Sequence, residues 1–174
     1  GASGGGGGAD NYSLSFDGND DYVGFSNSSD FDVVDELTIT VWIKPDEIQN
    51  AAIIDRLPYS GSNGYSLVTV TDGRIRAYFG PATSPDQAHT GTNYYSTGEW
   101  IHIAGVFKNS NYVKLYVDGT LIESVSTTRS FNTDKSLKFG RWYNTVGDNE
   151  YLNGNIDEVS IWDKALTQEE IQSY

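Results

Sequence analysis

Oxygen-bearing side chains gather near both ends of the chain, and their types suit a hard cation. Asn19 stands among the carboxylates of Asp17, Asp20 and Asp21, and Asp157 opens the last apolar run of the sequence. Calcium takes about six to eight oxygen ligands from carboxylates and carbonyls. The same residue types also form turns and strand ends without any metal. The residues alone therefore support two interpretations, a calcium site or ordinary turns.

A second group of residues has the chemistry of a ligand-binding face. Arg74, Arg76 and Tyr78 alternate with apolar residues and so share one face of a predicted strand. Arginine makes bidentate bonds to sulfate or carboxylate groups, and an aromatic ring can carry the C–H face of a sugar. The alternative is an ordinary solvated sheet face.

A third group lies in predicted loops, where aromatic residues are costly unless they pack or bind. It comprises the run Arg141-Trp142-Tyr143 with Tyr151 and, elsewhere in the chain, Arg56, Tyr59 and Tyr65. Loops carry function more often than strands do, so we expect these residues to form a binding rim. Packing beneath the loops remains the other interpretation.

Few residues offer nucleophilic or acid–base catalysis. The chain has no cysteine, which excludes disulfides, thiol nucleophiles and cysteine-ligated zinc. Its two histidines have no neighbouring motif that indicates a Ser-His-Asp arrangement. We therefore predict no catalytic residue.

Short strands must position these groups. Leu37, Ile39, Val41 and Ile43 alternate with polar residues and Trp42, the period-two pattern of a strand. Similar segments predict strands at 13–17, 21–25, 65–71, 74–80, 100–107, 112–117, 120–125, 137–142 and 156–162.

Two turns and one helix complete the expected elements. Asp72-Gly73 and Asp118-Gly119 each lie between alternating runs, which predicts two hairpins closed by type I′ turns. Thr167 and Glu170 have the spacing of a capping box at the start of one short terminal helix. The predicted fold is all-β, an antiparallel sandwich of two sheets with one short C-terminal helix.

Composition restricts the class of protein. The chain has 174 residues and a formal net charge of −13, so it lacks the basic surface of a nucleic-acid-binding protein. No apolar run approaches the ~20 residues of a membrane span, so we expect no membrane insertion. Residues 1–10 are predicted to be a flexible glycine-rich linker or tag remnant, and 11–174 a single domain.

Four segments resemble the laminin-G-like jelly-roll domains of the concanavalin A-like lectin and glucanase superfamily. They are SLSFDGNDDYVGF (13–25), LTITVWIKP (37–45), the pair GEWIHIAGVF and VKLYVDGTLI (98–107 and 113–122), and LNGNIDEVSIWDKALTQEEI (152–171). They occur in the family's order over almost all of the domain. The resemblance implies a concanavalin A-like jelly roll.

The resemblance also implies roles for particular residues. Similar family members hold a structural calcium between the opening turn and the closing aspartate, which here gives the side chains of Asp17 and Asp157 and the carbonyl of Asn19. Trp42 and Trp100 occupy family-typical positions and are interpreted as structural. Hydrolases of the superfamily carry a Glu-x-Asp-x-x-Glu string on one strand, which this sequence lacks.

Together these observations predict a non-catalytic module that binds a polysaccharide or oligosaccharide. The arginines on one face of an acidic protein favour an anionic glycan, sulfated or uronate. We expect the module to be secreted or at the cell surface, as one part of a larger protein whose catalytic domain it tethers to substrate. One alternative is an adhesive or structural domain that contacts protein at the cell surface. A degenerate enzyme is the other.

Overall fold

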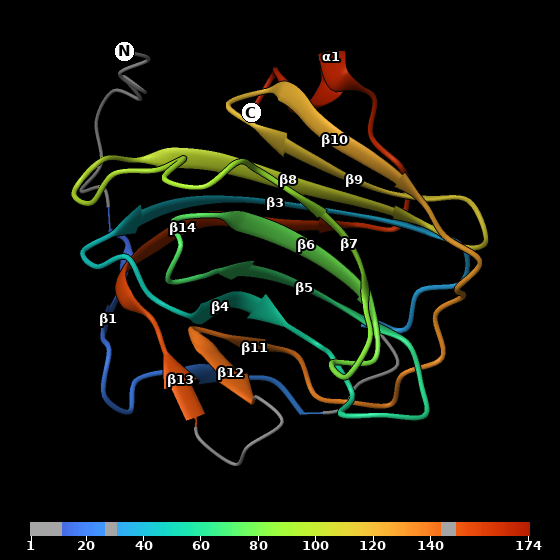
Figure 1. Ribbon diagram of the computed structural model, residues 1–174, viewed down its shortest axis with the longest axis horizontal. Coiled ribbons are helices and arrows are strands. Elements are labelled where there is room, and N and C mark those ends of the chain that lie inside the picture. Colours follow the sequence, from blue (N-terminus) through green and yellow to red (C-terminus); the bar gives the residue numbers. More distant parts are fainter. Residues whose placement is uncertain (1–11, 27–30, 144–148) are drawn as a thin grey trace.

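The computed structural model describes residues 12–26, 31–143 and 149–174, which form two stacked antiparallel sheets (Figure 1). The first sheet has the strand order β1-β14-β3-β8-β9-β10. Its strands are β1 (Leu14–Asp17), β14 (Asn153–Trp162), β3 (Glu36–Pro45), β8 (Ile101–Lys108), β9 (Tyr112–Val117) and β10 (Thr120–Ser126).

The second sheet has the order β2-β11-β4-β5-β6-β7 and faces the first across the core. It contains β2 (Val23–Gly24), β11 (Lys138–Phe139), β4 (Ala51–Asp55), β5 (Gly64–Thr69), β6 (Ile75–Gly80) and β7 (Asp86–His89). A separate hairpin pairs β12 (Arg141–Tyr143) with β13 (Asn149–Tyr151). The predicted class, a two-sheet antiparallel sandwich, is confirmed.

The core lies between the sheets and follows from the period-two alternation of the strands. Ile39, Val41 and Ile43 of β3 are fully buried against residues such as Leu67 and Phe79 of the second sheet. Each such side chain stabilises the fold by about 1.5–3 kcal/mol through removal of its surface from water. The alternate residues of the same strands therefore point outward on both sheets, where some of them, such as Thr38 and Thr40, are covered by other parts of the chain.

The two ends of the described chain meet in the first sheet, as predicted. β1 pairs with β14 from Leu14–Ile156 to Asp17–Asn153, and β14 in turn pairs with β3. The opening turn after β1 therefore lies beside the beginning of β14, because the two strands are antiparallel.

The two predicted glycine turns differ in type. Asp118 and Gly119 both have positive φ, 48° and 71°, which confirms the type I′ turn between β9 and β10. At Asp72-Gly73 only Gly73 has a positive φ, 75°, and its N–H donates to the Val70 carbonyl at 2.9 Å. The type I′ prediction is wrong there: a wider loop ends in a left-handed glycine, although the predicted hairpin of β5 and β6 does form.

The predicted strand at 137–142 is divided at Gly140. This residue has φ +77°, and a Cβ atom there would lie 2.5 Å from the Phe16 ring. The chain turns at this glycine out of β11 and into β12, so that β12 and β13 lie beside β4, near β11 in Figure 1. β4, β7 and β13 were not predicted.

The C-terminal helix α1 (Gln168–Ile171) begins with the predicted capping box. Thr167 accepts from the Glu170 N–H at 3.2 Å, and the Glu170 carboxylate accepts from the Thr167 N–H at 2.8 Å. Ile171 and Leu166 pack on Ala104 and Val106, which point outward from the first sheet. The helix segment thus covers part of that sheet's outer face. No helix among the described residues is long and apolar enough to cross a membrane.

Candidate functional site

The outer face of the second sheet carries a row of polar side chains that crosses five strands. Strand register places Lys138 beside Asp55, Asp55 beside Ser66, Ser66 beside Tyr78, and Tyr78 beside Gln87. All five stand at positions that alternate with core residues. This row forms the floor of the face on which the sequence predicted a ligand site.

The predicted arginines lie on this face, at the β6 side of the row. Arg76 donates from Nη1 to the Tyr78 hydroxyl at 3.0 Å and to Gln87 Oε1 at 3.4 Å. Both Arg74 and Arg76 form ion pairs with Asp72, at 3.5 and 3.7 Å. Two cations thus share one carboxylate, which leaves a local excess of one positive charge on a protein of net charge −13.

Tyr78 lies beneath the hairpin of β12 and β13 and is only 6% exposed. Its ring packs against Trp142 with the centroids 6.1 Å apart, and Ala52 and Val68 join the same cluster. Tyr78 is therefore part of the support for the face, and it does not offer the open stacking surface that the sequence suggested.

Two hydrogen-bond donors on either side of Tyr78 lack an acceptor. Trp142 Nε1 and Arg76 Nε are both buried, and neither has a hydrogen-bond partner among the described residues. Leaving a buried donor without a partner costs about 1–3 kcal/mol. A ligand oxygen that reached this point would satisfy such donors.

Arg141 stands at a rim of two aromatic rings. Its guanidinium lies 4.8 Å from the centroid of Tyr22 and 5.7 Å from that of Tyr151. Tyr22 is 47% exposed and follows the acidic turn directly. The sequence prediction missed Tyr22, although an aromatic residue beside a polar turn is the same signal that identified the other rim residues. The side chain of Tyr143 lies outside the described part of the structure.

Arg56 and Tyr59 do not join this face. The Arg56 side chain is 2% exposed, donates to the Phe31 and Lys135 carbonyls, and forms an ion pair with Asp32 at 2.7 Å. The guanidinium holds these loops together, so we drop Arg56 from the ligand surface. Tyr59 is exposed but follows β4 at the opposite end of β5 from Asp72, and the six residues of β5 span about 20 Å.

Asp55 is a buried carboxyl group in the floor of the face. Its side chain is almost inaccessible, and burial raises its pKa from 3.8 to about 7 despite a hydrogen bond from the Leu57 N–H and the charge of Lys138.

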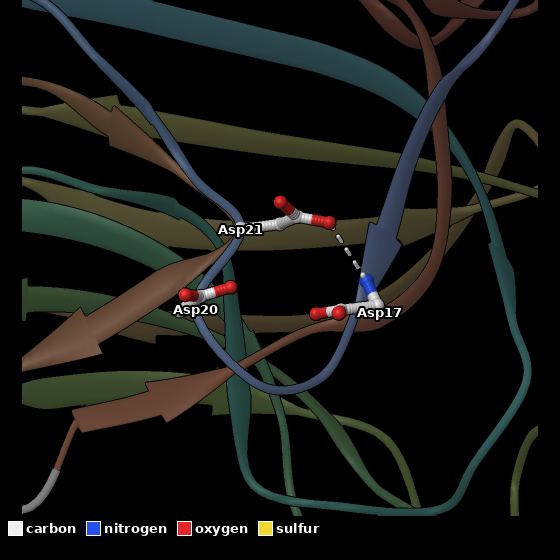
Figure 2. Close-up of side chains that lie close together, drawn as sticks. All are labelled: Asp17, Asp20 and Asp21. Atoms are coloured by element: carbon white, nitrogen blue, oxygen red, sulfur yellow. Dashed lines mark hydrogen bonds between the residues drawn. The ribbon is translucent and has the colours of Figure 1, made fainter.

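The acidic turn after β1 brings three carboxylates together (Figure 2). Oxygen atoms of Asp17, Asp20 and Asp21 lie within 4.8 Å of one another, and all three residues are exposed. The Asn19 N–H donates to Asp17 Oδ1 at 2.8 Å, and this bond holds the pKa of Asp17 below its ordinary value. Oxygen ligands at this spacing suit a calcium ion.

Asp157 does not belong to this cluster. Register pairs Asp17 with Asn153, four residues before Asp157 along β14, so the two backbones are about 13 Å apart along the strand. The prediction that the first and last strands meet is confirmed, but the side chains of Asp17 and Asp157 cannot share one ion. Asp20 and Asp21 are the carboxylates that the structure places beside Asp17.

Comparisons with known proteins agree on the fold. The model of a family described as the concanavalin A-like lectin/glucanases superfamily matches residues 17–172. Adhesion G-protein coupled receptor D1 of Homo sapiens is 34% identical over 86 residues, which cover 43% of this chain and 9% of the receptor. The matched segment is thus less than a tenth of that receptor's length.

Two solved structures illustrate the range of proteins with this fold. An SAP-like pentraxin from Limulus polyphemus aligns with a TM-score of 0.67 at 17% identity, covering 92% of this chain and 79% of its own. The second is Domain 4 of AbnA, an extracellular arabinanase from Geobacillus stearothermophilus, and this domain was solved in complex with arabinotriose. It aligns with a TM-score of 0.62 at 21% identity, covering 81% of this chain and 66% of its own. At these identities the likeness extends to the fold alone.

Proposed function

The protein belongs to the concanavalin A-like lectin/glucanases superfamily, and from that premise we propose that it is a non-catalytic carbohydrate-binding module. The outer face of the second sheet holds the glycan, with Arg74, Arg76 and Trp142 as its contacts and Arg141 at the rim. The buried donors Arg76 Nε and Trp142 Nε1, which lack acceptors among the described residues, are the observation that carries this proposal. Glycan oxygens supply those acceptors.

The proposed ligand is an anionic glycan. The side chains of Arg74 and Arg76 remain partly exposed, at 30% and 22%, and their two positive charges exceed the single negative charge of Asp72. A sulfate or uronate group can displace Asp72 from one guanidinium and bind it through two hydrogen bonds. We propose that the module is extracellular and tethers a neighbouring domain to such a polysaccharide. A domain of AbnA solved with arabinotriose gives a precedent for sugar binding on this fold.

Affinity electrophoresis tests this assignment. We expect native gels that contain sulfated or uronate polysaccharides to retard the protein, and Arg76→Gln to lose about tenfold or more in affinity, the effect of one charge-assisted hydrogen-bond pair. Lys135→Gln removes the same charge from an exposed side chain in a distant loop and serves as the matched control. Equal retardation of both variants would contradict the assignment, provided that their melting temperatures match.

A calcium ion in the acidic turn is the second part of the proposal. Asp17, Asp20 and Asp21 supply carboxylates, and the backbone carbonyl of Asn19 is the additional ligand that we retain from the sequence. Three carboxylates within one turn repel one another, and a divalent cation removes that repulsion. The role is structural, because the ion would fix the turn between β1 and β2.

An adhesive domain that contacts protein is the alternative function. It is favoured by the 34% identity to an adhesion receptor over 43% of this chain. The same electrophoresis separates the two functions, because a purely protein-binding domain is not retarded by any of the polysaccharides.

A further inference from the structure

The outer face of the first sheet carries a second aromatic surface, far from the arginines. Strand register pairs Trp42 with His102 and Ile43 with Ile101, and Lys44 and Trp100 are the next residues beyond that last pair. The Lys44 ammonium lies 5.7 Å from the centroid of the Trp100 ring, and the Trp42 and His102 rings are 5.2 Å apart. We call Trp100, Lys44, Trp42 and the β14 residues beside them the tryptophan face.

Among the described residues, those around α1 cover the other part of the first sheet and not this face. The segment around α1 packs on the other part of the sheet, over Ala104, Val106 and Tyr116. Trp100 is 41% exposed, although the sequence interpretation treated it as structural. The turn before it is tied to β3, because the Gly98 N–H donates to the Pro45 carbonyl at 2.7 Å. A large indole is thus presented to solvent on a rigid support.

Polar groups of β14 line the same face at the distance of a neighbouring strand. Asn155 pairs with Lys44 and Asp157 pairs with Trp42, while the residue between them, Ile156, points into the core. Asn155 also donates to the Ser13 hydroxyl at 3.2 Å. A ring, an ammonium, an amide and a carboxylate side by side match the C–H face and the hydroxyl groups of a sugar.

The charges of the face exclude an acidic ligand. Asp157 lies on one side of Trp42. On the other side, the Asp118 carboxylate accepts from the backbone N–H of His102 at 3.0 Å. His102 is buried, which lowers its pKa and keeps the imidazole neutral at physiological pH. This part of the sheet thus has one cation, Lys44, beside a row that carries two carboxylates, in contrast to the two arginines that share Asp72. A sulfated or uronate chain is repelled here, whereas a neutral sugar is accepted.

We infer that the tryptophan face is a second glycan site, specific for a neutral oligosaccharide whose ring stacks on Trp100 while its hydroxyls bind Lys44, Asn155 and Asp157. This inference rests on the proposed carbohydrate-binding function but uses a different surface and a different ligand class. The two sites lie on opposite faces of the sandwich. One molecule can then join an anionic chain to a neutral chain.

Two variants and two sets of gels test the second site. In native gels that contain debranched arabinan, xyloglucan or mixed-linkage glucan, we expect Trp100→Ala to lose about tenfold or more in affinity through lost stacking and burial. Trp100→Phe keeps part of the binding. Tyr174→Ala, which removes an exposed ring from the covered part of the same sheet face, serves as the control. Arg76→Gln keeps full retardation in these neutral gels.

Each outcome separates this inference from the proposed function. Retardation of the unmodified protein by anionic gels alone overturns the second site and leaves the first intact. Retardation by neither class overturns both. Unchanged binding of Trp100→Ala to the neutral polysaccharides also overturns the second site. Sedimentation velocity covers the remaining case: self-association that Trp100→Ala abolishes would assign the face to a second copy of the chain, against this inference.

Discussion

At the residue scale, the functional interpretation depends on polar atoms that the fold leaves without partners. Trp142 Nε1 and Arg76 Nε are buried on one face, and the described residues give neither an acceptor. The sequence could predict the shared face of Arg74 and Arg76, because alternation alone fixes it. It could not predict that Arg56 is buried against Asp32, because that depends on a loop 24 residues away in the chain.

Asp55 gives a residue-scale prediction about pH. Its folded pKa is raised to about 7 from 3.8, so between these values the folded state holds a proton that the unfolded state releases. The contribution of Asp55 to stability should therefore be full below about pH 4 and fall as pH rises toward 7, by up to about 1.4 kcal/mol per pH unit.

The variant Asp55→Asn isolates this effect from the other carboxyl groups. Asn can still accept the Leu57 N–H but cannot ionise, so its free energy of unfolding should lack the decline. Chemical denaturation of both proteins from pH 4 to 8 measures the difference, which should grow in favour of the variant as pH rises. If the free energies of unfolding of the two proteins changed in parallel with pH, the raised pKa of the buried Asp55 would be refuted.

At the element scale, strong alternation was predictable and short strands were not. β3, β8 and β9 have regular periods, and their predicted bounds agree with the structure within one or two residues. β4 was missed because its first four residues, AAII, are all apolar and show no alternation, as expected of a strand that is buried on both faces. β13 was missed because its three residues acquire their pairing only when Gly140 turns the chain back over the sheet.

The turn between β1 and β2 gives an element-scale prediction about calcium. When the free calcium concentration is 100 times the Kd, binding stabilises the folded state by about 2.7 kcal/mol. This raises the Tm by roughly 5–10 °C in a domain of this size. We expect that increase for the unmodified protein in calcium compared with chelator.

Three aspartate variants locate the ion. Asp20→Asn should abolish the calcium-dependent increase in Tm. Asp157→Asn should retain it, since register places Asp157 about 13 Å from Asp17. Asp134→Asn, which alters an exposed loop carboxylate, is the control. If Asp157→Asn abolished the calcium-dependent increase in Tm and Asp20→Asn kept it, our choice of ligands would be wrong.

At the scale of the whole molecule, two sheets provide two outward faces of different charge. The second sheet offers paired arginines against a net charge of −13, and the first offers tryptophan beside carboxylates. The sequence predicted one face and missed the other, because the exposure of Trp100 depends on how much of the first sheet the C-terminal segment covers. The family alone does not decide function, since this fold carries many.

A glycan array probed with the unmodified protein tests the central claim most directly. We predict that the protein binds sulfated or uronate glycans and that this signal weakens as salt increases, because ionic contacts are screened. The same array read in chelator reports whether the calcium turn contributes to binding. An array with no glycan bound above background in either buffer would contradict the assignment of this protein as a carbohydrate-binding module.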